Sequence, residues 1–218
     1  MITESLLVET ERIYSSGEVT LGITPWRKSP FDRETPPTSV FDGHRMRPRT
    51  KDHGRARGYA KAYSEVLKDR EINVMAEMGI LRGIGLAIWC DVFPKARIIG
   101  LDWDLTAYAD FTTMLLKRGA FQKNTPEIHQ FDEISPFASY DLRRILGREK
   151  LDLFIDDALH YDAAIINSFS AFHRSVKIGG LYIIEDNKNV ASVLAKTYRG
   201  QHEVRSFNEL TVITIGEG

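Results

Sequence analysis

Cysteine is almost absent from this sequence, which contains Cys90 alone among its 218 residues. An intramolecular disulfide is therefore excluded, and so is a zinc site built on several cysteines. No stretch reaches the ~20 apolar residues that a membrane-spanning helix needs. The segment Met1–Glu11 carries acidic residues where a signal peptide would carry basic ones, so we do not expect a signal peptide there. These features are compatible with a reducing compartment and predict a cytoplasmic protein.

A large excess of positive charge is also missing, because 29 Lys and Arg are balanced by 30 Asp and Glu, which gives a formal net charge of −1. A general nucleic-acid binder needs many basic groups to displace counterions from phosphates. We therefore expect no nucleic-acid partner. The length fits one domain with an appended arm.

The first quarter of the chain differs from the rest. Residues 1–20 are compatible with a short helix, whereas residues 22–58 hold five prolines and few apolar residues, which predicts an irregular arm or loop. Between residues 42 and 70, nine Lys or Arg face four acids. This basic segment is either a solvated face or a lid over an anionic or hydroxylated ligand. We accordingly divide the chain into an N-terminal arm or lid segment, 1–58, and a domain, 59–218.

Beyond residue 58, short apolar runs alternate with helical patterns. The strand candidates are 72–77, 96–102, 127–131, 151–156, 181–185, 203–207 and 210–215. The helix candidates are 59–68, 85–93, 105–118, 140–146, 162–176 and 190–198, and we expect the helix 162–176 to stop at Gly179-Gly180. This order predicts an α/β fold in which helices cover both faces of a mostly parallel sheet. The last two strands predict a hairpin around Asn208 and hence an antiparallel edge strand. Ligands of such sheets bind at the carboxyl ends of the strands.

A nucleoside cofactor site is predicted after the first two strand candidates. Gly79, Gly83 and Gly85 would let a ligand approach the backbone and the free N–H groups of the next helix. Asp102 ends the second strand, where a carboxylate can accept both ribose hydroxyls. The glycine spacing is not the dinucleotide fingerprint of NAD enzymes. Glu77 would repel a pyrophosphate and attract the cationic groups of S-adenosylmethionine (SAM), so we favour SAM, although Glu77 is alternatively a capping acid.

Three further residues are candidates for the cofactor site. Trp103 follows the second strand and either walls the nucleoside or packs in the core. Asp132 follows the third strand and either contacts adenine or forms a turn. Asp156 ends the fourth strand, where it either binds the cofactor or only orients the turn.

Pairs of acids end two neighbouring strand candidates, Asp156-Asp157 in one and Glu185-Asp186 in the other. Four carboxylates at one sheet edge repel one another unless a cation or protonation relieves them. Oxygen ligands without nearby cysteine favour Mg²⁺ or Mn²⁺ over Zn²⁺. The alternative is a polar turn and a helix cap. His160 has an ordinary pKa of ~6.5, which suits a general base, although a lone histidine is more often structural.

The chain resembles the metal-dependent sugar O-methyltransferases related to macrocin and mycinamicin O-methyltransferases, and the cephalosporin hydroxylase-like proteins of the same fold. The resemblance covers about Lys51 to Asn187. It is most specific at 155–160 (IDDALH) and 179–186 (GGLYIIED), and 75–89 with 100–102 is similar to the cofactor half of the family.

This resemblance implies a class I SAM-methyltransferase fold, Rossmann-like, with a seven-stranded sheet formed by the domain 59–218. It also implies bound SAM, a divalent metal and, by family habit, a homodimer. In the family pattern Asp157, Glu185 and Asp186 are metal ligands, and His160 is the catalytic base. Asp157 would therefore act in catalysis as well as in metal binding.

The resemblance further implies SAM- and Mg²⁺-dependent methylation of a sugar hydroxyl. The acceptor would be a glycoside, an oligosaccharide, a polysaccharide precursor such as a mannoside, or a natural-product sugar. Independently of the resemblance, a basic arm that closes over an oligosaccharide would let Trp26 or Tyr59 stack on a sugar face. A catechol-like small-molecule O-methyltransferase and a non-catalytic SAM-binding domain remain alternatives. A hydroxylase is disfavoured, because no clear set of two histidines and one carboxylate for iron is present.

Overall fold

The computed structural model of the chain describes residues 2–15, 45–46 and 57–217. The short helix expected within residues 1–20 is confirmed as α1 (Glu4–Ser15). The predicted irregular arm and its proposed lid role fall outside the described residues, apart from positions 45–46 and 57–58. Trp26, a proposed sugar-stacking residue, also lies outside them.

Seven strands form one sheet with the order β3-β2-β1-β4-β5-β7-β6. They are β1 (Val74–Met78), β2 (Arg97–Asp102), β3 (Glu127–Gln130), β4 (Leu151–Asp156), β5 (Val176–Ile184), β6 (Glu203–Phe207) and β7 (Leu210–Thr214). The pairings are parallel from β3 to β5, whereas β7 runs antiparallel to both β5 and β6. The predicted sheet, with a closing hairpin at one edge, is confirmed.

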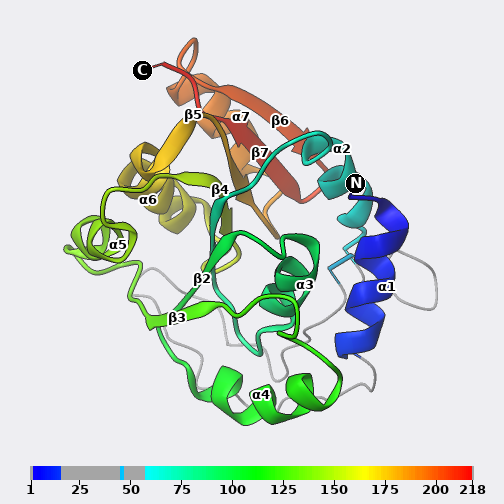
Figure 1. Ribbon diagram of the computed structural model, residues 1–218. Coiled ribbons are helices and arrows are strands. Elements are labelled where there is room, and N and C mark those ends of the chain that lie inside the picture. Colours follow the sequence, from blue (N-terminus) through cyan, green and yellow to red (C-terminus); the bar gives the residue numbers. More distant parts are fainter. Residues whose placement is uncertain (1, 16–44, 47–56, 218) are drawn as a thin grey trace.

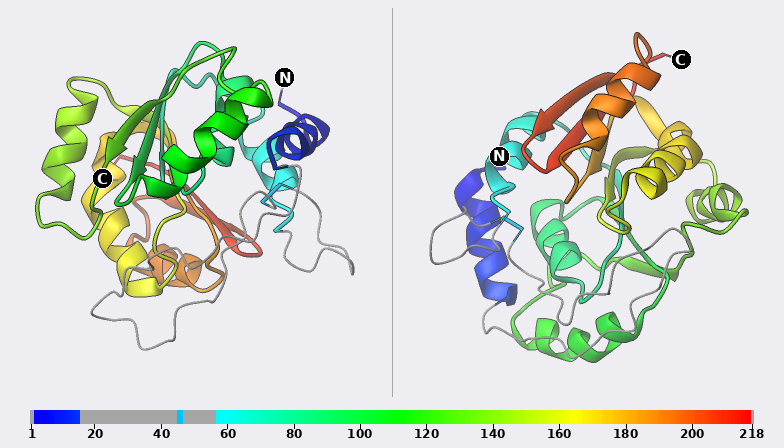
Figure 2. Two further views of the ribbon diagram at one scale, coloured as in Figure 1. Left: turned by 90° about the horizontal axis from the view of Figure 1, so that it is seen from below. Right: turned by 180° about the vertical axis from the view of Figure 1, so that it is seen from behind.

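Helices cover both faces of this sheet, as predicted (Figures 1 and 2). Together with α1 they are α2 (Ala60–Val66), α3 (Ile84–Val92), α4 (Thr106–Lys117), α5 (Ala138–Leu146), α6 (Asp162–Phe172) and α7 (Val190–Thr197). One apolar layer joins α1, α2, α3 and α4 to the sheet, and a second layer joins α5, α6 and α7 to the opposite face. Among the described helices, none combines the length and the apolar character needed to cross a membrane.

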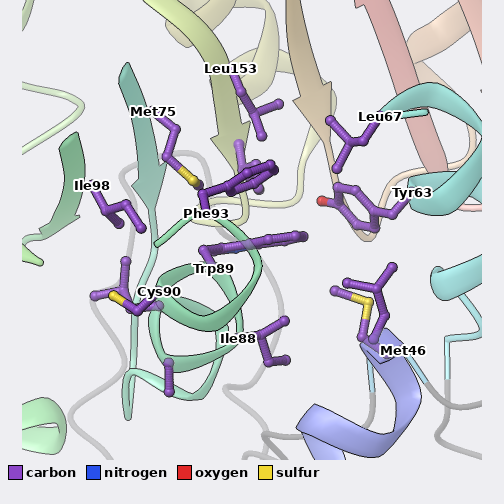
Figure 3. Packing of buried hydrophobic residues seen from close by; sticks show 14 of the residues in the cluster. Met46, Tyr63, Leu67, Met75, Ile88, Trp89, Cys90, Phe93, Ile98 and Leu153 are labelled. Carbon is purple, nitrogen blue, oxygen red and sulfur yellow. The ribbon is translucent and has the colours of Figure 1, made fainter. Parts of the chain in front are cut away.

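Alternate residues of each strand enter opposite layers, because side chains of a strand alternate between its two faces. In β4, Leu153 and Ile155 belong to the layer of α2 and α3, whereas Phe154 belongs to the layer of α6. Trp89 of α3 lies at the centre of the first layer, with its ring 5.0 Å from that of Tyr63 (Figure 3). The same alternation decides which way the acids at the strand ends face.

Two adjoining sequence-based boundaries were wrong, the end of the helix 162–176 and the start of the strand 181–185, which begins at Val176. We expected a helix from residue 162 to 176 that stops at Gly179-Gly180, but α6 ends at Phe172 and is followed by a single 3-10 turn, η1 (His173–Ser175). The glycines lie inside β5, where Gly179 has φ +78° and its N–H donates to the Ile215 carbonyl at 2.7 Å. They absorb an irregularity in the pairing of β4 with β5 rather than ending a helix.

Candidate active site

The turn after β1 brings the two halves of the site into backbone contact. Gly79 has φ +89°, a left-handed conformation that glycine adopts without strain. Its N–H donates to the Leu101 carbonyl at 2.8 Å, and the Asp157 N–H donates to the Met78 carbonyl at 2.9 Å. A Cβ at position 79 would lie within 3.0 Å of the Asp157 carbonyl group. The predicted cofactor turn therefore packs directly against the predicted metal loop.

Glu77 of β1 faces α3 and is completely buried. Gly85, in the first turn of α3, makes this possible, because a Cβ there would overlap the Glu77 carboxylate and the Arg45 guanidinium. Gly83 precedes α3 with φ +81°, and a Cβ on it would overlap the ring of Tyr108. Each of the three predicted glycines thus occupies a position where a Cβ atom would overlap a neighbouring group.

Three more of the predicted cofactor residues, Asp102, Trp103 and Asp132, lie at the ends of β2 and β3, on one side of β1 in the sheet. The Asp102 carboxylate accepts the Leu81 N–H at 2.9 Å and the Asp104 N–H at 3.1 Å, and burial raises the pKa of the Asp102 carboxyl. The Trp103 carbonyl accepts a hydrogen bond from the Gln130 side chain.

Asp132 follows β3 and accepts the Ile134 N–H at 3.2 Å, as expected of a turn residue. Its contact with adenine stays a prediction. Together with Glu77 and Asp102, it places polar side chains at or near the carboxyl ends of three adjacent strands, β1, β2 and β3.

Asp156 faces the opposite side of the sheet from Glu77. It is 2% exposed, its carboxylate accepts the Tyr182 hydroxyl at 2.8 Å, and burial raises the pKa of Asp156 to about 7. Tyr182 belongs to the layer of α6. A cofactor-binding role for Asp156 stays a prediction, and its contacts in the structure are those of a buried hydrogen-bonded pair.

Asp157, His160 and Asp186 form a compact cluster at the ends of β4 and β5. Each offers one ligand atom, and these three atoms all lie within 4.8 Å of one another. Two of the three predicted metal ligands are thus brought together, along with the predicted base. Asp186 has φ +59°, an uncommon conformation for a residue other than glycine.

Glu185, the third predicted metal ligand, is fully buried and is not one of these three residues, although its charge acts on the neighbouring Asp157. Arg45 lies between Glu185 and Glu77, with Nη1 2.5 Å from Glu77 Oε1 and Nη2 2.6 Å from Glu185 Oε1. Nη1 is also 3.6 Å from Asp157 Oδ2. The Tyr63 hydroxyl donates to the same Glu185 oxygen.

The sequence analysis did not predict the contacts of four side chains with these acids, those of Arg45, Arg57, Tyr59 and Tyr63. Arg57 Nη2 lies 2.7 Å from Asp186 Oδ2, and the Tyr59 hydroxyl donates to Asp186 Oδ1 at 2.6 Å. The basic excess of residues 42–70 was a signal for the arginines Arg45 and Arg57, but we interpreted it as a solvated face or a lid and not as ion pairs with the site acids. Tyr59 is 1% exposed, so the suggestion that it stacks on a sugar was wrong.

The described side chains of the site carry an excess of negative charge, which a bound cation would neutralise. The four site carboxylates are those of Glu77, Asp157, Glu185 and Asp186. Among the described residues, two guanidiniums face them, and that of Arg57 also pairs with Glu209, so at least two negative charges of these groups are left over when all the acids are ionised. Burial, reinforced by the neighbouring Glu185, raises the pKa of the Asp157 carboxyl well above its ordinary value. A divalent metal bound there would oppose this shift, because a nearby cation favours the ionised carboxylate.

Two buried oxygen atoms also fit the groups that the family pattern implies. Glu77 Oε2 and Glu185 Oε2 have no hydrogen-bond partner among the residues that the structure describes. A buried carboxylate oxygen without a partner is costly. The first is suited to the amino group of SAM and the second to a metal ion, because both supply positive charge at an acid. The residues present therefore fit both SAM and a divalent metal ion.

The loop that carries His160 is anchored by Asn187. The Asn187 amide donates to the His160 carbonyl at 2.9 Å and to Asp162 Oδ1 at 2.8 Å, and its oxygen accepts the Val190 N–H at the start of α7. Burial lowers the pKa of the His160 imidazole below its ordinary value. The ring is therefore neutral near pH 7 and able to accept a proton.

Comparison with solved structures establishes the fold class. The chain is similar to the MycE methyltransferase from the mycinamycin biosynthetic pathway, solved in complex with Mg, SAH and mycinamycin VI. The TM-score is 0.58 at 19% identity, over 77% of this chain and 51% of that one. It is also similar to the O-methyltransferase TomG of Streptomyces achromogenes, solved with SAM, with a TM-score of 0.53 at 11% identity over 71% and 78% of the two chains. The chain has the class I SAM-methyltransferase fold.

Curated sequences give a more specific likeness. The chain is 27% identical over 138 residues to L-olivosyl-oleandolide 3-O-methyltransferase of Streptomyces antibioticus, which covers 59% of this chain and 31% of that protein. It is 32% identical over 105 residues to mycinamicin VI 2''-O-methyltransferase of Micromonospora griseorubida, 48% of this chain and 23% of that protein. No family model matches the chain.

The resemblance to sugar O-methyltransferases that the sequence motifs indicated is confirmed by these relatives. The matched part nevertheless amounts to less than a third of each curated relative. The chain spans about half the length of the MycE structure.

Proposed function

We propose that this chain transfers the methyl group of SAM to a sugar hydroxyl in a reaction that depends on Mg²⁺ or Mn²⁺. The observation that carries the proposal is the cluster of Asp157, His160 and Asp186 beside Glu185, at the strand ends next to the Glu77 turn. The class I methyltransferase fold and the sugar O-methyltransferases among the relatives support it.

The residues divide into two groups by their task. Glu77 would bind the amino group of SAM and Asp102 its ribose, while the glycine turn admits the nucleoside against the backbone. Asp157, Glu185 and Asp186 would hold the metal. The chemistry that the two groups supply when bound is an electrophilic methyl group from SAM and, from the metal, a lower pKa of the acceptor hydroxyl.

His160 would take the proton of the acceptor hydroxyl. Its lowered pKa keeps the imidazole unprotonated near neutral pH, so a ring nitrogen can receive the proton. Asn187 fixes the backbone of this residue through a hydrogen bond to the His160 carbonyl. The main contribution of the site would be to hold the hydroxyl oxygen in line with the methyl group.

The proposal also covers the cellular location, the oligomeric state and the acceptor. We expect a cytoplasmic homodimer whose acceptor is a natural-product sugar or a polysaccharide precursor such as a mannoside. The names of the curated relatives, which include a rhamnosyl tetracenomycin-C methyltransferase, support a sugar attached to a natural product. Light scattering of the purified protein tests the dimer.

The deciding experiment is a methyl-transfer assay read by mass spectrometry. A panel of mono- and disaccharides, natural-product glycosides and catechols is incubated with SAM and Mg²⁺, with and without EDTA. We expect a mass gain of one methylene on glycosides, lost in EDTA and in H160A. Methylation of catechols alone would favour the small-molecule alternative, and SAM binding without turnover would favour the non-catalytic one. Full activity in EDTA would contradict the role of the metal.

A further inference from the structure

The start of α2 presents two tyrosine hydroxyls to two consecutive acids. Tyr59 directly precedes α2 and Tyr63 follows one turn later, so both side chains lie on the same side of this helical segment. They are 1% and 0% exposed. Tyr59 donates to Asp186 and Tyr63 donates to Glu185, which are 127 and 122 residues further along the chain.

Tyr59 contacts both the side chain and the backbone of Asp186. Its hydroxyl donates to Asp186 Oδ1 at 2.6 Å and accepts the Asp186 N–H at 3.1 Å. One oxygen atom therefore fixes the carboxylate relative to its own backbone. Asp186 needs such support, because its φ of +59° lies in the left-handed region, where a side chain is disfavoured.

Tyr63 is held by packing as well as by its hydrogen bond. Its ring lies against Trp89 with 5.0 Å between the ring centroids, at the centre of the apolar layer (Figure 3). The hydroxyl therefore has a fixed position from which it meets Glu185.

We propose that Tyr59 and Tyr63 are positioning residues of the metal site, which hold the carboxylates of Asp186 and Glu185 in the orientation that a cation requires. The inference rests on the proposed function, because it assumes that these acids bind the metal. Groups that hydrogen-bond to metal ligands fix the ligands before the ion arrives. α2 thus contributes to metal binding without contacting the metal.

A purely structural role would be limited to burying two aromatic rings. The structure offers a matched control for that alternative in Tyr14 of α1. Tyr14 is 2% exposed, and its hydroxyl donates to the Asp91 carboxylate at 2.8 Å. Replacement of any of the three by Phe keeps the ring and removes one hydroxyl bonded to a carboxylate. Only Tyr59 and Tyr63 bond to predicted metal ligands.

The test measures Mn²⁺ binding to the full-length wild type, Y59F, Y63F and Y14F, by titration calorimetry and by the electron paramagnetic resonance spectrum of the bound ion. We expect Y59F and Y63F to weaken binding by about 10- to 100-fold and Y14F to change it by less than about twofold. The spectrum of residual bound Mn²⁺ should change in Y59F and not in Y14F. Circular dichroism confirms that each variant is folded.

The outcomes separate the inference from the proposed function. If the wild type binds no Mn²⁺, the proposed metal site itself is wrong. If the wild type binds Mn²⁺ and both Y59F and Y63F bind it as Y14F does, the positioning role is wrong. Should Y59F fail to fold, Y63F carries the same comparison through Glu185.

Discussion

The buried carboxylates of Glu77 and Glu185 share a single guanidinium, that of Arg45, at 2.5 and 2.6 Å. Glu77 belongs to the predicted cofactor half of the site and Glu185 to the predicted metal half. Arg45 therefore couples the two halves electrostatically. Both acids are fully buried, so their charges depend on this cation for compensation.

Replacing Arg45 by Gln should destabilise the metal-free protein strongly. Removal of one partner of a buried ion pair leaves an uncompensated charge and costs about 3–5 kcal/mol of unfolding free energy. Urea unfolding in EDTA measures the loss. Added Mg²⁺ should reduce the difference from the wild type, because a divalent ion at the neighbouring Asp157 restores positive charge beside these acids.

Arg97 provides the control for this prediction. It also bridges two carboxylates, those of Glu127 and Glu149, at 2.8 and 2.7 Å, but all three side chains are substantially exposed. The R97Q variant should lose at most about 1 kcal/mol per pair, independently of Mg²⁺. Equal losses in R45Q and R97Q would show that burial does not make the Arg45 bridge special.

The contact between Gly79 and Asp157 leads to a prediction about sterics. Gly79 and Gly200 have similar φ angles, +89° and +79°, but a Cβ at 79 would overlap the Asp157 carbonyl, whereas a Cβ at 200 meets nothing within 4 Å. G200A should cost only the left-handed conformation, about 1–2 kcal/mol. G79A should cost about 1–3 kcal/mol more, because the backbone of Asp157 must move.

Denaturant unfolding of G79A and G200A measures this difference, and Mn²⁺ titration shows its effect on the site. G79A should weaken metal binding by displacing Asp157, while G200A should leave it unchanged. If the two variants lost the same free energy, the turn after β1 would not be packed against the metal loop.

Much of the fold was predictable because its signals are local. Apolar runs such as 151–156 marked the strands to within a few residues, and the acids that end them were placed at one sheet edge. The opposite orientations of Asp156 and Asp157 also follow from the period of two in a strand, although the sequence interpretation did not use it. The end of α6 was missed, because glycines were taken as a helix stop when they lie within a strand.

The ion pairs of Arg45 with Glu77 and Glu185 were not predictable from local sequence patterns. Arg45 meets partners that are 32 and 140 residues away in the chain, and no local spacing relates them. The basic excess around it is compatible with an exposed face as well as with buried ion pairs. Only the assembled sheet shows that Glu77 and Glu185 face the same layer, and that a cation is needed between them.

His202 should make stability depend on pH. Its Nδ1 accepts the Gly216 N–H at 3.2 Å, and burial, reinforced by His173, lowers the pKa of His202 below its ordinary value. The unfolded chain then binds the proton at higher pH than the folded chain does. The contribution of His202 is present above its ordinary pKa of ~6.5 and is lost as the pH falls through the lowered value.

The H202N variant keeps an acceptor for the Gly216 N–H but does not titrate. Unfolding free energies of wild type and H202N between pH 5 and 8, measured in urea, should therefore converge in acid, as the wild type loses stability that the variant does not lose. Parallel curves across this range would remove His202 as the cause.

Two different sets of residues are candidates for the metal ligands. The family pattern assigns Asp157, Glu185 and Asp186, whereas the compact cluster in the structure consists of Asp157, Asp186 and His160. Mg²⁺ prefers oxygen ligands, and a ligating imidazole would not be available as a base. We therefore expect Glu185 to bind the metal and His160 to remain outside its coordination.

Calorimetry of Mg²⁺ binding to E185Q, H160N and D157N decides between the two sets. E185Q and D157N should each weaken binding by at least about tenfold, because each removes a carboxylate ligand, and H160N should weaken it much less while abolishing methyl transfer. Pulsed electron resonance of bound Mn²⁺ should show no coupling to a histidine nitrogen in the wild type. Loss of Mg²⁺ binding in H160N with retention in E185Q would instead make His160 a ligand, and the base for the acceptor proton would have to be another residue.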